Sequence, residues 1–122
     1  AVPGAFTPTC SERHLPGYVE HYDAFRAKGI EVACMAVNDA FVMHAWGKSQ
    51  HVPPGMNMLA DGNADLTRAL GLELDASGYG MGVRSKRFAL YAEDGIVRGL
   101  WVEAPGEFRV SSAEYVLAHL PT

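Results

Sequence analysis

The stretch RFALYAEDGIVRGLWVE, from Arg87 to Glu103, does most to decide the fold. Its two halves are rich in apolar and β-forming side chains, and Asp94 and Gly95 separate them. An Asp-Gly pair between two strand-like runs is a strong signal for a β-hairpin. The sequence therefore predicts that two adjacent strands pair here, and the remaining elements are assigned outward from this hairpin.

Helical and strand-like segments alternate before the hairpin, and one helical segment follows it. Apolar residues at intervals of three and four predict a helix over residues 10–28, in which Pro16 should introduce a kink because it lacks a backbone donor. We further expect strands over 31–37 and 56–60, a helix capped by Asn38 or Asp39, a helix over 64–70 and a flexible loop over 77–82. Ser111 and Glu114 have the spacing of a capping box at the start of the last helix.

This order of elements predicts an α/β fold of the thioredoxin type, with residues 1–122 forming a single domain. In such a fold a central strand runs directly into the loop that here contains Val2 and Pro3. We therefore expect the domain to be incomplete at its N-terminus and to lack the N-terminal strands, including the central one. A sheet without that strand would expose an unpaired edge in its core, which is an aggregation hazard.

The composition excludes several classes of protein. The formal net charge is −4 and the basic residues are dispersed, whereas a nucleic-acid binder normally carries a basic stripe. No apolar run approaches the roughly 20 residues that span a bilayer. The two cysteines, Cys10 and Cys34, are too few for a disulfide-stapled scaffold, so reduced thiols in the cytoplasm are the simplest interpretation. Because the N-terminus looks incomplete, targeting to an organelle stays open.

The segment PGAFTPTC, Pro3 to Cys10, carries the best chemical signal. Cys10 should lie in the first turn of a helix, where free backbone N–H groups and the helix dipole favour a thiolate over a thiol. Thr7 offers a hydroxyl nearby, and Pro3 and Pro8 stiffen the loop. Taken alone, a single cysteine is more often a small buried hydrophobe than a nucleophile.

A comparison with dithiol oxidoreductases sharpens the prediction for Cys10. Those enzymes place two cysteines three positions apart at the start of this helix, and here Thr7 occupies the first position. Without an adjacent thiol, Cys10 cannot carry out the usual disulfide exchange, whereas a single thiolate suits attack on a peroxide with formation of a sulfenic acid. Cys34 lies in an apolar strand, where burial should keep it an inert thiol.

The chain resembles a type-II peroxiredoxin. The resemblance rests on four collinear motifs that cover nearly the whole chain: PGAFTPTCSERHLPGY, VNDAFVMHAWGK, MLADGNADLTRALGLELD and GMGVRSKRFALYAEDGIV. The family signature of proline, threonine and cysteine is present as Pro3, Thr7 and Cys10. The family also uses one arginine at the start of a strand, which matches Arg87 here, with Arg84 as the alternative.

The resemblance implies a hydroperoxide reductase that needs no cofactor. Cys10 would attack the peroxide, held by Pro3, Gly4, Thr7 and Arg87, and would become a sulfenic acid. Glutathione, glutaredoxin or thioredoxin would then reduce it, because the C-terminal region that supplies a second cysteine in mammalian peroxiredoxin 5 has none here. Cys34 matches a second cysteine of plant and bacterial members, and it would resolve the sulfenic acid only if the fold opened.

The resemblance also implies a homodimer, formed in part by loops near Phe6 and Phe41. From the residues alone, however, Phe41 and Trp46 are more simply part of the core. Two other functions stay open: a redox sensor or thiol-disulfide exchange protein that works through oxidation of Cys10, and an inactive fragment. No metal site is expected, because the histidines lack a recognised ligand spacing: His14, His21, His44, His51 and His119.

Overall fold

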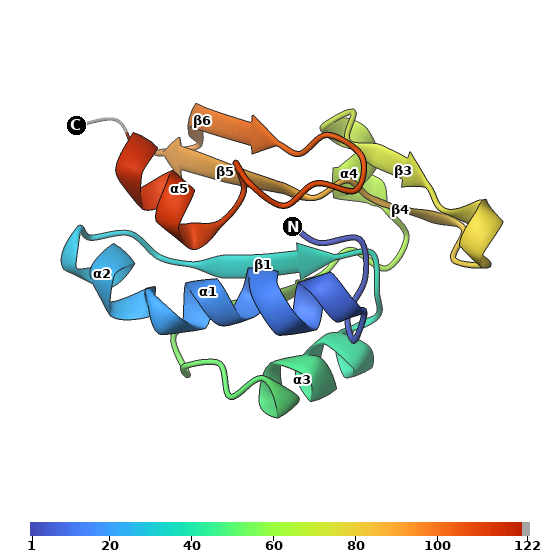
Figure 1. Ribbon diagram of the computed structural model, residues 1–122, viewed down its shortest axis with the longest axis horizontal. Helices are drawn as coiled ribbons and strands as arrows, with labels where there is room; N and C mark the ends of the chain where they lie inside the picture. Colours follow the sequence, from blue (N-terminus) through green and yellow to red (C-terminus); the bar gives the residue numbers. More distant parts are fainter. Residues whose placement is uncertain (121–122) are drawn as a thin grey trace.

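The computed structural model describes residues 1–120 of the chain (Figure 1). In chain order its elements are η1 (Cys10–His14), α1 (Leu15–Glu20), α2 (Tyr22–Ala27), β1 (Ala33–Ala36), α3 (Ala40–Ser49), β2 (Asn57–Ala60), α4 (Asp65–Ala69), β3 (Glu73–Asp75), η2 (Ser77–Tyr79), β4 (Val83–Ser85), β5 (Phe88–Glu93), β6 (Ile96–Val102) and α5 (Ala113–His119). This mixed α/β order is the one that the sequence predicts. No helix in the described part of the chain is long and apolar enough to cross a bilayer.

The first two residues lie between β1 and β5 (Figure 1). Val2 donates its backbone N–H to the carbonyl of Met35 (3.0 Å) and forms a parallel bridge with Ala36. Ala1 and Phe88 exchange two hydrogen bonds, of 2.8 and 3.2 Å, which is the pattern of an antiparallel pair. The start of the chain therefore connects the parallel pair β1–β2 to the antiparallel hairpin β5–β6, at the place where the sequence predicts the end of a central strand.

The hairpin of β5 and β6 forms as predicted. Asp94 and Gly95 make its turn with φ values of 49° and 78°. Both residues have positive φ, as the tight two-residue turn requires, and this is why a short polar residue and a glycine stand there. The register carries a bulge between Tyr91 and Ala92. The ladder brings the residues at its open end, Arg87 and Glu103, side by side.

The long helix predicted over residues 10–28 is divided into three segments. Its first turn, η1, is π-helical, and the change to α-helical geometry comes at Leu15, directly before Pro16. A π-helical turn is one way in which a helix accommodates a residue without a backbone donor. A second break follows at His21, whose φ and ψ of −95° and 11° leave the α region.

Three other expectations were wrong in detail. Phe41, predicted as core, is 87 % exposed, whereas Trp46 is fully buried, because α3 turns only Met43, Trp46 and Gly47 inward. Ser112, not Ser111, caps α5 by accepting the N–H of Tyr115 (3.2 Å), since the Ser111 hydroxyl is already bonded to Glu103. The sequence also did not indicate the short strands β3 and β4, which flank the loop over residues 77–82.

The helices and strands bury a main hydrophobic core, and a second, smaller cluster consists of Met35, Leu72 and Phe88. α1 and α5 lie close together, because a Cβ built on Gly17 would be only 3.8 Å from the Cβ of Ala113. α3 packs against β2, and its Trp46 donates the indole N–H to the hydroxyl of Ser11 (3.0 Å). These contacts fix the helix start that carries Cys10 from two sides.

Candidate active site

Cys10 lies in the first helical turn, as predicted. Pro8 and Thr9 are already helical, and η1 begins at Cys10 itself. The residue is only 1 % exposed, so its sulfur faces the interior of the site and not bulk solvent. Backbone N–H groups of a first turn have no acceptor within the helix, and they favour a negative charge at this sulfur.

Arg87 reaches the same sulfur from the start of β5. Its Nη2 donates to Sγ of Cys10 at 3.1 Å, although the two residues are 77 positions apart in the chain. A guanidinium is permanently charged and donates in a fixed planar geometry, so it stabilises a thiolate. Arg84, the alternative from the sequence, instead donates to the carbonyls of Met81 (2.9 Å) and Val37 (3.2 Å).

His14 binds the same guanidinium, a role that the sequence did not predict. Nη1 of Arg87 donates to its Nδ1 (2.9 Å), and its Nε2 meets the carbonyl oxygen of Ser111 (3.0 Å). A guanidinium only donates and a carbonyl only accepts, so the ring is neutral with the proton on Nε2. Burial, chiefly, and the charge of Arg87 lower the pKa of His14 well below its usual value. The spacing of four between Cys10 and His14 puts both on one helix face, which was the available signal.

Thr7, Gly4 and Pro3 form the loop before the helix. The hydroxyl of Thr7 donates to the carbonyl of Gly4 (2.7 Å), and the carbonyl of Thr7 accepts the N–H of Ser11 (2.9 Å). A Cβ built on Gly4 would lie 3.1 Å from Cγ2 of Thr7 and 3.3 Å from Nη1 of Arg84. These contacts hold Gly4 and Thr7 close together within the loop, and the Arg84 side chain packs against Gly4. Pro3 is half-buried beside it.

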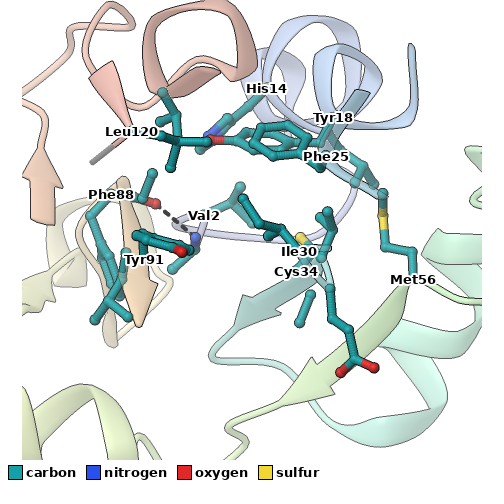
Figure 2. A pocket seen from close by; sticks show the side chains of 18 residues that line it. Val2, His14, Tyr18, Phe25, Ile30, Cys34, Met56, Phe88, Tyr91 and Leu120 are labelled. Carbon is teal, nitrogen blue, oxygen red and sulfur yellow. Dashed lines mark hydrogen bonds between the residues drawn. The ribbon is translucent and has the colours of Figure 1, made fainter. Parts of the chain in front are cut away.

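Cys34 lies apart from this constellation, on β1. It lines a cavity between β1, β5 and the first helices, where Figure 2 shows it with Val2, Ile30 and Met56. Burial raises the pKa of the Cys34 thiol to about 11. Both cysteines are free thiols. Within residues 1–120, no group of three or more histidine, cysteine or acidic side chains could hold a metal ion.

The comparison with known proteins identifies the family. A family model described as Redoxin matches residues 1–117. Peroxiredoxin-2B of Arabidopsis thaliana is 50 % identical over 98 % of this chain and 74 % of that protein. The chain belongs to the peroxiredoxins of the redoxin family.

Other members of the peroxiredoxin family agree with this assignment. Peroxiredoxin-2E-2, chloroplastic, of Oryza sativa subsp. japonica is 53 % identical over 98 % of this chain and 55 % of that protein. The crystal structure of reduced Prx3 in complex with H₂O₂ from Vibrio vulnificus is 55 % identical, with a TM-score of 0.91 over 96 % of this chain and 72 % of that one. These likenesses confirm the predicted thioredoxin-like fold. The chain spans about half the length of the rice relative.

Proposed function

We propose that this peroxiredoxin is a thiol-dependent peroxidase that reduces hydrogen peroxide and alkyl hydroperoxides, with Cys10 as its nucleophile. One observation carries the proposal: the guanidinium of Arg87 donates to the Cys10 sulfur at 3.1 Å on the first turn of a helix. A thiolate, not a thiol, attacks an O–O bond, and this contact supplies the positive charge that a thiolate needs. Membership in the peroxiredoxin family supports the same reaction.

In the first half-reaction the thiolate of Cys10 attacks the terminal oxygen of the hydroperoxide. An S–O bond forms while the O–O bond breaks, so Cys10 becomes a sulfenic acid and the other oxygen leaves as alkoxide or hydroxide. That oxygen takes a proton from water, which gives an alcohol or water. The guanidinium of Arg87 and the backbone N–H of Cys10 stabilise the charge on the departing oxygen. The Thr7 hydroxyl, whose own proton is bonded to the Gly4 carbonyl, accepts a hydrogen bond from the O–H of the peroxide.

Gly4 and Pro3 shape the entrance to this site. The contact between Gly4 and Thr7 keeps the backbone of the loop close to the helix start, and a side chain at position 4 would have to displace its neighbours. Pro3 limits the access of water to the sulfur, because it offers no backbone donor and is half-buried. The low exposure of Cys10 fits a narrow substrate such as a hydroperoxide.

The second half-reaction uses a thiol from another molecule. The nearest candidate within the chain, Cys34, is buried and protonated at neutral pH because its pKa is about 11. A protonated thiol does not attack a sulfenic acid efficiently. Glutathione, glutaredoxin or thioredoxin therefore regenerates Cys10. The cytosol predicted from the sequence keeps such thiols reduced, and the name of the rice relative places that protein in the chloroplast.

The loop and α3 also form the surface for a homodimer. Phe6 is 55 % exposed and Phe41 is 87 % exposed. The backbone N–H of Ala5 donates to the side-chain oxygen of Asn38 (3.0 Å), which ties the Phe6 loop to the start of α3. Exposed aromatic residues on a loop and an adjoining helix start are typical of interface anchors.

A peroxide-consumption assay tests the proposed activity. With excess glutathione and glutaredoxin, the protein should consume hydrogen peroxide and an alkyl hydroperoxide over many turnovers. Cys10→Ser should abolish this activity, whereas the matched variant Cys34→Ser should keep it. Unchanged activity in Cys10→Ser would overturn the assignment. One stoichiometric oxidation of Cys10 without turnover would instead indicate a redox sensor.

A further inference from the structure

We propose that Glu103 is a positioning residue for the peroxidase reaction, acting on Cys10 through Ser111, His14 and Arg87. Glu103 directly follows β6, and its backbone N–H donates to the carbonyl of Arg87 (2.9 Å). This bond extends the β5–β6 ladder by one step. It fixes the backbone from which the Arg87 side chain starts. The inference rests on the proposed function.

The side chain of Glu103 holds the loop that leads into α5. Its Oε2 accepts three hydrogen bonds: from the N–H of Arg109 (2.6 Å), the N–H of Ser111 (2.9 Å) and the hydroxyl of Ser111 (2.6 Å). Burial opposes ionisation of this carboxyl, but the Ser111 hydroxyl and the backbone donors together hold its pKa below the usual range. Glu103 is therefore a carboxylate at neutral pH.

The bonds to Glu103 place the Ser111 carbonyl, which faces the active site. This oxygen accepts from Nε2 of His14 (3.0 Å) and from the hydroxyl of Tyr18 (2.7 Å). Nδ1 of His14 in turn accepts from Nη1 of Arg87 (2.9 Å), while Nη2 of Arg87 donates to the Cys10 sulfur. The hydrogen bonds thus form a closed ring that runs from the backbone of Arg87, through Glu103, Ser111 and His14, back to its guanidinium.

This closed ring of hydrogen bonds restrains Arg87 both at its backbone and at its guanidinium. Arginine has a long side chain whose rotamer entropy works against a single orientation, so each end needs a partner. The edge of the Phe108 ring also contacts His14, with ring centroids 5.3 Å apart, and Phe108 belongs to the same loop. Moving this loop would therefore shift His14 and, through it, Arg87.

The negative charge of Glu103 strengthens its hold on the loop. The second oxygen, Oε1, is buried and has no hydrogen-bond partner among the described residues. The three donors converge on a single oxygen, and a charged acceptor binds them more strongly than an amide oxygen would.

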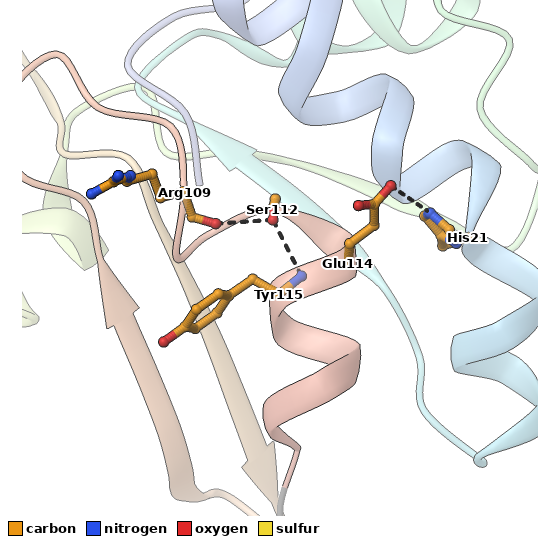
Figure 3. A network of polar contacts seen from close by, with 5 residues as sticks. All are labelled: His21, Arg109, Ser112, Glu114 and Tyr115. Carbon is orange, nitrogen blue, oxygen red and sulfur yellow. Dashed lines mark hydrogen bonds and ion pairs between the residues drawn. The ribbon is translucent and has the colours of Figure 1, made fainter.

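The test compares Glu103→Gln and Ser111→Ala with Ser112→Ala. Ser112 is the neighbouring serine, and Figure 3 shows it between the Arg109 carbonyl and the Tyr115 N–H. Its loss removes a helix cap without touching Glu103, His14 or Arg87, so it controls for destabilisation of α5. Ser111→Ala keeps both backbone donors to Glu103 and remains informative if Glu103→Gln folds poorly.

Two readouts are needed. The first is the alkylation rate of Cys10 by iodoacetamide as a function of pH, which requires no peroxide. Glu103→Gln should lower the rate at neutral pH and move the midpoint of the profile upward, with a smaller shift in Ser111→Ala and none in Ser112→Ala. The second is kcat/KM for peroxide, which should fall by up to about tenfold in Glu103→Gln and no further than in His14→Leu, the effect of a misplaced group. The KM for the thiol reductant should not change.

A double-variant experiment separates a positioning role of Glu103 from general destabilisation of the protein. If Glu103 acts through His14, Glu103→Gln should have little further effect on alkylation in a His14→Leu background. The titratable groups that face this network are His14, Tyr18, Cys34 and the amino group of Ala1, so each variant is also compared in a Cys34→Ala background. A folded Glu103→Gln protein with the wild-type alkylation profile would overturn the inference. An absence of peroxidase activity in the wild-type protein would overturn only the proposed function.

Discussion

The two cysteines occupy opposite kinds of environment within one chain. Cys10 sits at a helix start with a guanidinium nitrogen 3.1 Å from its sulfur, whereas Cys34 sits on β1 and lines an apolar cavity (Figure 2). Both are at least nine-tenths buried, so exposure alone does not distinguish them. The difference teaches that a buried sulfur becomes a nucleophile through a paired charge, and stays an inert thiol without one.

The largest effect should come from replacing the guanidinium that binds Cys10. Arg87→Lys keeps the charge but loses the fork that contacts both Cys10 and His14, so kcat/KM for peroxide should fall by about a hundredfold. Arg84→Lys is the matched control, since Arg84 bonds only to backbone carbonyls. Steady-state kinetics would decide, and an equal loss in the two variants would show that Arg87 has no special role.

A smaller effect should follow from removing the partner of Arg87. His14→Leu leaves Nη1 of Arg87 without its acceptor, and we expect a loss of about tenfold in kcat/KM. His21 provides the control, because it lies in the same helical region and only forms a surface ion pair with Glu114 at 3.7 Å. His21→Leu should stay within about twofold of the wild type. If both histidine variants behave alike, the contact to Arg87 does not matter for the rate.

A still smaller effect is expected for the loop in front of Cys10. In Gly4→Ala the new methyl group would lie 3.1 Å from Cγ2 of Thr7 and 3.2 Å from Cε of Met81, so the loop must shift by a few tenths of an ångström. We expect a roughly fivefold loss of kcat/KM. Gly17→Ala is the control, since its methyl group would lie 3.8 Å from Ala113 and should stabilise α1 by about 0.5–1 kcal/mol. Thermal unfolding and kinetics together test this pair, and full activity in Gly4→Ala would contradict the tight fit.

The smallest effect on activity is expected for Cys34, where stability should respond instead. The pKa of Cys34 is raised to about 11, so from pH 9 to about 11 the unfolded chain binds fewer protons than the folded one. The free energy of unfolding should therefore fall across that window and should not depend on Cys34 below it. Cys34→Ala should remove the slope between pH 9 and about 10, while kcat/KM stays within about twofold of the wild type. Burial also raises the pKa of Tyr18, so a slope above about pH 10 should persist in both proteins. Denaturant titrations at pH 7, 9 and 10 measure it, and a slope between pH 9 and 10 that persists in Cys34→Ala would assign that titration to another group.

Several elements could be predicted because their signals are local. The Asp-Gly turn sets its own φ values, Asp39 caps α3 through its own side chain at 2.8 Å from the N–H of Val42, and Cys10 follows directly from its loop. The errors arose where a distant contact decided the outcome. Ser111 and Ser112 are both good caps by sequence, and only the bond from Ser111 to Glu103 leaves Ser112 to cap the helix.

The sequence by itself determined which sulfur stands at a helix start, which residues form the loop before it, and that a hairpin follows. Those features depend on neighbours along the chain. Only the tertiary structure decided that Arg87, and not Arg84, reaches Cys10, that His14 is neutral, and that Glu103 holds the loop behind them. Residues up to 97 positions apart meet there, and such contacts depend on how the helix packs onto the hairpin, which no local pattern encodes.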